Sequence, residues 1–250
     1  MRSLFICSKC AHEGNVENSI STTLVNDSGH YFYKCNFGHK TVQICQDMKF
    51  ESLFDYGANA IIDGYYREGV LSFTASLERF YEYFIKVTME YNKVDRNIFN
   101  SSWKKMSNQS ERQLGAFITA YLICFGEEPN ILNSSLSGFR NKVAHKGYIP
   151  NRDETIQYGQ EIMSLIIPDI IKLKASCNEQ VISSIRDKVF EGQNFISEME
   201  QEHGGIDNKS TMAGSTILSI TNDDLHVGDL NQKLLELKEK KQMLANFPHF

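Results

Sequence analysis

The chain has 250 residues, a formal net charge of −5 and 41% hydrophobic residues, enough for an ordinary packed core. The acidic balance argues against a protein that coats nucleic acid with its whole surface. No apolar run approaches a membrane span, and the N-terminal apolar stretch is too short for a secretory signal. We therefore expect a soluble cytoplasmic protein, without a membrane partner, whose six cysteines stay reduced.

Positive charge is concentrated in residues 101–150. This stretch holds three acidic residues, and its six basic residues are Lys104, Lys105, Arg112, Arg140, Lys142 and Lys146. The local balance is therefore +3 within an acidic chain. Any contact with nucleic acid is expected to be local and to involve this stretch.

Residues 1–48 predict a small β unit. Strand-like patterns at 19–25 and 31–35 flank Asn-Asp-Ser-Gly at 26–29, which is a good turn signal, so we expect a hairpin. Residues 40–45 indicate a third strand. The unit has too little apolar material to fold without a staple.

A metal site is the expected staple. Cys7 and Cys10 are separated by two residues, and Cys35 and His39 by three, with the predicted hairpin between the pairs. This pattern resembles a zinc ribbon with tetrahedral Zn²⁺, and four protein ligands would make the zinc structural. Because two intervening residues are more usual in the second pair, the fourth ligand stays open between His39 and three alternatives, namely Cys45, His12 and His30.

Residues 50–200 predict helices, because apolar residues recur there with a period of about 3.6. The periodic positions, from the first helix to the fifth, are Phe54, Ala58, Ile61, Ile62 and Tyr65; Val70, Phe73, Leu77, Phe80, Tyr81 and Phe84; Leu114, Phe117, Ile118 and Tyr121; Leu132, Leu136, Phe139 and Val143; and Ile156, Ile162, Leu165 and Ile166. The fourth helix is expected to end near Gly147, and the fifth to bend before Pro168. The expected architecture is mainly α, an antiparallel helical bundle with the small β unit at its N-terminus.

Residues 203–228 are rich in Gly, Ser, Asn and Asp and are expected to form a linker. Residues 229–250 predict an amphipathic helix whose apolar positions are Leu230, Leu234, Leu237 and Leu244. Two roles for this helix stay open at the level of sequence. It serves self-association or a partner groove, or it docks on its own helical domain.

The fourth predicted helix carries a polar motif. Phe139 and Val143 face the core, whereas His145 lies about 200° around the helix from Val143, at about 100° per residue. Asn141 shares a face with His145 and is placed to orient the imidazole. The long side chain of Arg140 is able to reach the same cleft.

Arg140, four intervening residues and His145, with the polar Asn141 directly after the arginine, resemble the motif of HEPN domains (higher eukaryote and prokaryote nucleotide-binding). The segment 76–80, Ser-Leu-Glu-Arg-Phe, and the two helices that open the domain are also similar to that family. The resemblance covers about residues 50–175. It implies a homodimer in which two copies of the motif form one composite ribonuclease site.

These residue types suit RNA cleavage. Imidazole changes charge near neutral pH, so His145 is able to exchange a proton with a ribose 2′-OH or a leaving oxygen. Arg140 is able to stabilise charge on phosphate, and Lys142 and Lys146 to hold the RNA backbone. Attack by the 2′-OH needs no metal and leaves a 2′,3′-cyclic phosphate. The resemblance further implies a toxin or antiviral-defence role.

Other interpretations stay open. His145 is also well placed to interact with the last carbonyls of its helix, and Arg140 to pair with Glu78 or Glu82. The main alternative function is a noncatalytic adaptor that binds nucleic acid or protein. Its working surfaces would be the zinc ribbon and the C-terminal helix.

Overall fold

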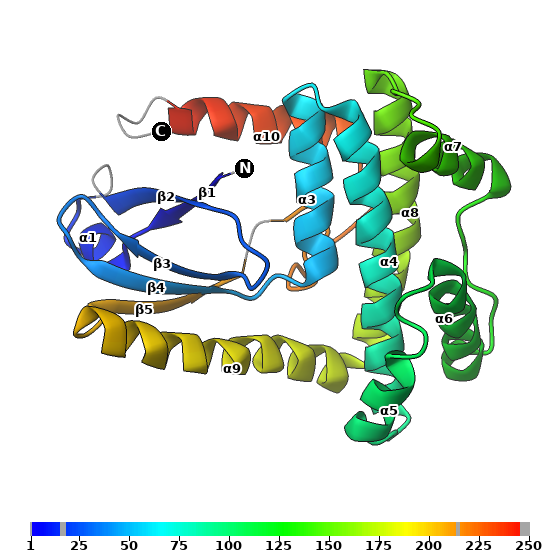
Figure 1. Cartoon of the computed structure of the whole chain (residues 1–250), viewed down its shortest axis with the longest axis horizontal. Helices are drawn as coiled ribbons and strands as arrows, with labels where there is room; N and C mark the ends of the chain where they lie inside the picture. Colours follow the sequence, from blue (N-terminus) through cyan, green and yellow to red (C-terminus); the bar gives the residue numbers. More distant parts are fainter. Residues whose placement is uncertain (1, 16–18, 214–215, 246–250) are drawn as a thin grey trace. The chain divides into compact units, whose positions relative to one another are not determined.

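The computed structural model describes residues 2–15, 19–213 and 216–245 (Figure 1). The chain is mainly helical, with a small β region at its N-terminal end. It forms two compact units. The first unit contains residues 1–47, 185–215 and 239–250, and the second contains 48–184 and 216–238. None of the described helices combines the length and apolar character needed to cross a bilayer.

The first unit holds two small sheets. β1 (Arg2–Ile6) pairs antiparallel with β2 (Ile20–Leu24), and the short helix α1 (Ser8–His12) lies between them in the chain. In the second sheet β4 (Lys40–Cys45) is the central strand. It pairs antiparallel with β3 (His30–Lys34) and parallel with β5 (Asn208–Met212). The central position explains why residues 41–44 are all buried.

The strands predicted at 19–25, 31–35 and 40–45 are confirmed, but the predicted hairpin between the first two is wrong. β2 pairs with β1 and β3 pairs with β4, so residues 25–29 connect two different sheets. The Asn-Asp-Ser-Gly turn does form, because the side chain of Asn26 accepts a hydrogen bond from Gly29 N at 2.9 Å. The turn residues therefore predict where the chain reverses direction, but they do not determine which strands pair with each other.

Residues of α9 (Asn178–His203) from 185 onward belong to the first unit, whereas the sequence placed them in the helical domain. They pack on the β3–β4–β5 sheet. Gly192 lies against Ile44 so closely that a Cβ atom there would meet the Ile44 side chain at 2.6 Å. The rings of Phe32 and His203 stack with centroids 4.1 Å apart. The part of α9 from residue 185 onward therefore packs on the β3–β4–β5 sheet, although it is distant from β3 and β4 in the sequence.

In the second unit α4 (Tyr66–Tyr91) packs against α3 (Lys49–Ile62), α5 (Arg96–Trp103), α6 (Ser110–Phe125), α7 (Ser134–His145) and α8 (Arg152–Ser176). The five predicted helices are confirmed as α3, α4, α6, α7 and α8, but Tyr65 and Leu132, which were assigned to the first and the fourth, lie outside α3 and α7. Their fully buried side chains form an aromatic-rich core that includes Phe54, Phe73, Phe80, Phe84, Phe117, Tyr158, Ile162 and Ile166.

Side chains define the helix ends. Asn151 and Glu154 form a reciprocal capping box at the start of α8, which continues through Pro168 to Ser176. Asn133 caps α7 by accepting from Leu136 N at 2.9 Å. At the other end of α7, Gly147 has φ of +70° and lets Tyr148 N donate to Lys142 O, so the predicted stop near this glycine is confirmed.

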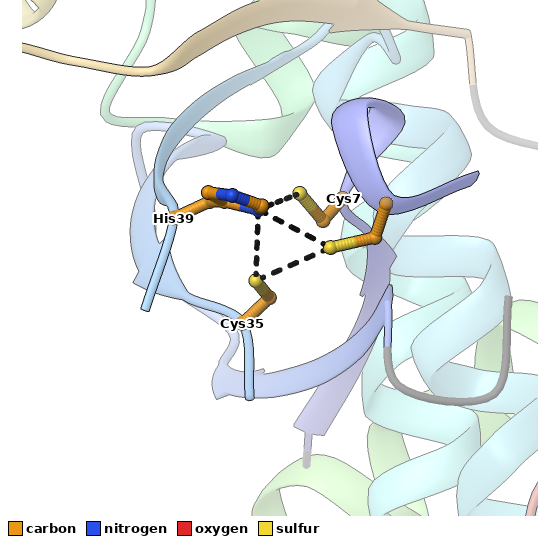
Figure 2. Close-up of side chains that lie close together, drawn as sticks. Cys7, Cys35 and His39 are labelled. Carbon is orange, nitrogen blue, oxygen red and sulfur yellow. Dashed lines mark hydrogen bonds between the residues drawn. The ribbon is translucent and has the colours of Figure 1, made fainter. Parts of the chain in front are cut away.

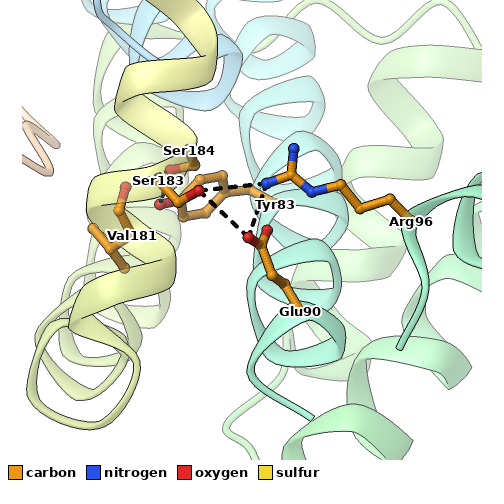
Figure 3. A network of polar contacts seen from close by, with 6 residues as sticks. All are labelled: Tyr83, Glu90, Arg96, Val181, Ser183 and Ser184. Carbon is orange, nitrogen blue, oxygen red and sulfur yellow. Dashed lines mark hydrogen bonds and ion pairs between the residues drawn. The ribbon is translucent and has the colours of Figure 1, made fainter. Parts of the chain in front are cut away.

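Polar contacts fix the start of α9 to α4 and α5 (Figure 3). The Tyr83 hydroxyl lies 3.0 Å from the Ser184 hydroxyl, which donates to Val181 O. Glu90 accepts from Arg96 at 2.8 Å and from the Ser183 hydroxyl at 3.4 Å. The helix is thus anchored within the second unit before it continues past residue 184.

Residues 203–228, predicted as a linker, contain structure. β5 extends the sheet of the first unit, and residues 216–228 carry the buried side chains Leu218, Ile220 and Leu225 into the second. Two acidic side chains of α3 hold this segment, because Glu51 accepts from Ile220 N at 2.7 Å and Asp55 from Ile217 N at 3.0 Å. The polar composition of residues 216–228 therefore gave no sign of an ordered segment, because its order depends on backbone N–H groups that donate to carboxylates of α3.

α10 (Leu230–Ala245) begins on the surface of α8. Gln160 accepts from Leu230 N at 2.8 Å and donates to Gly228 O at 3.0 Å. Leu230 and Leu234 are buried and Leu237 is half-buried, whereas the side chain of Leu244 lies outside the described residues. Of the two roles left open, docking on its own helical domain therefore describes the first half of this helix.

Asp169 of α8 is a buried carboxyl group, 7% exposed, that accepts a hydrogen bond from the Tyr121 hydroxyl at 3.1 Å. Burial raises its pKa from 3.8 to about 6, although Tyr121 and Lys172 oppose the rise. A pKa raised in the folded state means that the contribution of this group to stability is lost as pH rises from about 4 through 6.

We therefore predict that Asp169→Asn, which keeps an acceptor for Tyr121, changes stability little at pH 4. At pH 8 it raises the free energy of unfolding by about 1–3 kcal/mol. Urea unfolding at both pH values measures the difference, with the exposed Asp224→Asn as the matched control. An equal effect of Asp169→Asn at both pH values would contradict this account.

Candidate functional site

The first cysteine pair lies where β1 meets α1. Cys7 directly precedes α1 and Cys10 lies in its first turn, and both side chains are fully buried. Cys7 N donates to Ser19 O at 2.8 Å, and Cys7 O accepts from Ala11 N at 3.0 Å. The helical turn therefore brings two cysteines that are three positions apart to the same side of the backbone.

The second pair lies in the β3–β4 hairpin. Lys34 and Lys40 are paired at the ends of the strands, so residues 35–39 form the loop. Gly38 has φ of +79° and donates from its N–H to Cys35 O at 2.8 Å. This tight loop turns Cys35 and His39 toward Cys7, as Figure 2 shows.

The four ligand atoms, three sulfurs and Nδ1 of His39, all lie within 4.8 Å of one another. Nδ1 is 3.2 Å from the sulfur of Cys10, 3.6 Å from that of Cys35 and 3.8 Å from that of Cys7. The sulfurs of Cys10 and Cys35 are 3.6 Å apart. A tetrahedral metal with ordinary zinc bond lengths gives about 3.8 Å between sulfurs and about 3.6 Å between sulfur and nitrogen. The residues therefore fit a tetrahedral metal ion.

The thiols respond to one another electrostatically. Burial opposes ionisation of Cys7, yet hydrogen bonds from Cys10 N and His39 lower its pKa to about 7. Burial and the neighbouring sulfurs raise the pKa of Cys10 to about 12. Ionisation of Cys7 is thus favoured over ionisation of Cys10, and a bound cation would favour the thiolate form of both.

A residue from the far end of the chain completes the surroundings of Cys7. Asn208 Nδ2 donates to the Cys7 sulfur at 3.2 Å, and its Oδ1 accepts from the Ser8 hydroxyl at 3.2 Å. The parallel pairing of β5 with β4 places Asn208 beside Thr41. The sequence offered no signal for this contact, since Asn208 lies 201 positions from Cys7 in a segment expected to be a linker.

Among the described residues the alternatives to His39 lie outside this cluster. The ring of His30 packs against Phe195, with centroids 5.6 Å apart. Cys45 packs against the buried aromatic group of Phe5, Tyr31 and Tyr33. Of the four candidates weighed from the sequence, His39 is thus the residue that joins the three cysteines.

The Arg–His motif lies on α7. Val143 is fully buried, and Phe139 packs against Tyr158 of α8 with ring centroids 5.6 Å apart. Both side chains face the core, as predicted. His145 is the last residue of α7 and is exposed, together with Asn141, Lys142 and Lys146. The helix thus turns a polar, positively charged face outward.

Arg140 lies at the border of the buried face. Its Nε is buried without a hydrogen-bond partner, and among the described residues its side chain makes no ion pair. The expectation that it pairs with Glu78 or Glu82 is therefore not met. Glu82 instead binds Arg79 and the indole of Trp103. Burial raises the pKa of Tyr158, and the nearby charge of Arg140 opposes that rise.

One copy of the chain does not bring the motif residues together. Arg140 and His145 are about 140° apart around the helix, at about 100° per residue. Asn141 shares the face of His145, but the part of the chain described here holds no hydrogen bond between them. Lys142 and Lys146 share one face, and neither forms an ion pair with a described residue.

Comparison of the chain with protein-family models, with curated proteins and with solved structures found no match. The family resemblance of the motif therefore rests on its residues alone.

We predict that the cluster binds one Co²⁺ per chain with the absorption spectrum of a tetrahedral, thiolate-ligated ion. Cys10→Ser removes a ligand and is expected to abolish the sulfur-to-metal bands. Cys45→Ser is the matched control and is expected to retain them, because Cys45 lies outside the cluster. Equal loss in both variants, or binding by Cys10→Ser with an unchanged spectrum, would contradict the assignment.

The same titration tests Asn208. Asn208→Leu removes the N–H that stabilises the Cys7 thiolate, so the affinity for Co²⁺ is expected to fall about 10- to 100-fold while the tetrahedral spectrum persists. Unchanged affinity would show that this contact is incidental.

Proposed function

We propose that this chain is an endoribonuclease of the HEPN type that acts as a homodimer and cleaves RNA without a metal in its active site. The observation that supports this proposal best is the polar face of α7. It combines an exposed His145, an arginine with an unpartnered buried donor and two unpaired lysines. Among the residues that the structure describes, none of these four side chains has a hydrogen-bond or ion-pair partner of the kind that a purely structural role would supply.

His145 suits proton transfer. In its neutral form it takes the proton from a ribose 2′-OH, and the 2′ oxygen then attacks the adjacent phosphorus. The bond to the 5′ oxygen breaks, and this oxygen takes a proton from an imidazolium. The products are a 2′,3′-cyclic phosphate and a 5′-hydroxyl. A duplex or strand of DNA lacks the nucleophile.

Arg140 suits the phosphate. Its planar guanidinium binds two oxygens at once and stabilises the charge that develops during attack. The unpartnered Nε is a donor that a phosphate oxygen would satisfy. Lys142 and Lys146 would add electrostatic attraction for the RNA backbone, and Asn141 would orient His145 on the face they share.

Dimerisation would supply what one chain lacks. Arg140 and His145 point in different directions on α7, so a second copy is needed for an arginine and two imidazoles to meet at one phosphate. The segment after the motif exposes apolar surface, with Ile149 76% and Tyr148 41% exposed. Such surface beside the motif suits a contact between two copies.

The metal cluster suits structural zinc. Three thiolates and one imidazole favour Zn²⁺, and four protein ligands leave no open position for catalysis. Zinc would serve as the staple of the small β unit, which we propose is a zinc ribbon that recognises the RNA target or a protein partner. Regulation through this unit and α10 fits a toxin or antiviral-defence ribonuclease.

We predict that the purified protein cleaves RNA and that His145→Ala lowers the rate about 100-fold or more, the usual size of general acid–base catalysis. Arg140→Ala is expected to lower it about 100-fold through lost charge stabilisation. Gel electrophoresis of an end-labelled RNA pool measures the rates, and size-exclusion chromatography confirms that both variants remain dimeric.

His226→Ala and Arg152→Ala are the matched controls, since both residues are exposed and belong to the second unit. They are expected to cleave as the unmodified protein does. Binding of RNA without turnover in every variant would contradict the nuclease. It would favour a noncatalytic adaptor, which the divergence of Arg140 and His145 in the single chain also suits.

A further inference from the structure

The second unit contains a pocket formed by residues 85–120, which precede the α7 motif in the chain. The C-terminal part of α4, the short helix α5 and the first two thirds of α6 line a hollow of about 550 Å³ that is open to solvent. This volume lies within the range of about 300–1,000 Å³ that is usual for small-molecule sites. Its walls are apolar, with Ile85, Met89, Ile98, Phe99 and Met106 among them.

The hollow exists because α6 carries small residues on this face. Gly115, Ala116 and Ala120 line the pocket. A Cβ atom on Gly115 would meet nothing within 4 Å, so packing does not require glycine there. A glycine in a helix interior costs about 0.5–1 kcal/mol relative to alanine. Gly115 is exposed, and together with Ala116 and Ala120 it leaves the hollow unfilled by side chains of α6.

The walls are adaptable and partly uncovered. Met89 and Met106 are flexible, polarisable side chains that adjust to the shape of a ligand. Ile98 of α5 is 64% exposed although it lines the pocket, so apolar area there is available to be covered. These features favour an apolar ligand body over an ordered water cluster.

Arg112 gives the pocket a charge. Its guanidinium donates to Lys105 O at 2.9 Å, which leaves most of its donors free, and it forms no ion pair with any described residue. Lys104 and Lys105 precede Met106 in the same connection and are exposed. A cation at the border of an apolar hollow is complementary to a ligand with an apolar body and an anionic head.

We infer that this pocket binds a small amphiphilic anion, a monocarboxylate with a medium-length apolar chain, whose carboxylate pairs with Arg112. The inference stands apart from the proposed nuclease, because none of the motif residues lines the pocket.

Decanoate is the probe, and isothermal titration calorimetry of the full chain measures its binding. The only tryptophan, Trp103, reports the location, since its ring stacks on the pocket residue Phe99 with centroids 6.0 Å apart. We expect one decanoate per chain and a change in tryptophan emission with the same midpoint. Decylammonium is expected to bind at least about tenfold more weakly, a difference of about 1.4 kcal/mol.

Two variants with matched controls test the residues. Gly115→Leu fills the pocket from a position with free space and is expected to weaken decanoate at least tenfold (about 1.4 kcal/mol). Gly138→Leu, also at a helical glycine with free space, is expected to leave decanoate binding unchanged.

Arg112→Gln is expected to weaken the binding of decanoate but not that of decanol, whereas Arg152→Gln is expected to change the binding of neither. The inference is overturned by absence of binding heat, by unchanged affinity in Gly115→Leu, or by decylammonium binding as tightly as decanoate.

Discussion

Burial of the aromatic side chains of α4 is the constraint on which the helical unit depends. Phe73, Phe80 and Phe84 are at most 1% exposed, and the helices packed against α4 cover them. Burial of large apolar side chains is the main favourable contribution to the folding free energy of a domain. It also fixes α7, because Val143 and Phe139 must stay on the core side. The polar face with Arg140 and His145 is thereby turned outward, whatever ligand it meets.

The sequence predicted what short-range periodicity and ligand spacing encode. The five amphipathic stretches became helices, and Cys7, Cys10, Cys35 and His39 came together, because knuckle geometry is local to each pair. Strand pairing and side-chain contacts between residues far apart in the chain could not be predicted from the sequence. β5 joins β4 from a segment that composition marks as a loop, and Asn208 reaches Cys7 only through that pairing. Glu51 and Asp55 hold residues 216–220 by accepting from the backbone N–H groups of Ile220 and Ile217, which no periodicity reveals.

The two candidate sites differ in how complete one chain makes them. Three sulfurs and one imidazole nitrogen lie within 4.8 Å of one another in the single chain, so these four residues could hold a metal ion without a second copy. The α7 motif leaves Arg140 Nε without a partner and His145 in solvent. We propose that a further molecule completes this face, namely RNA held between two copies of the chain.

The most direct test of this account uses an RNA oligonucleotide and its twin with a single 2′-deoxy nucleotide at the cleaved bond, without added divalent metal. The account predicts that the ribose form is cut to a 2′,3′-cyclic phosphate and a 5′-hydroxyl, and that the 2′-deoxy twin resists cutting at that bond. Cleavage of the twin at the same bond, or products that end in a 3′-hydroxyl and a 5′-phosphate, would contradict it.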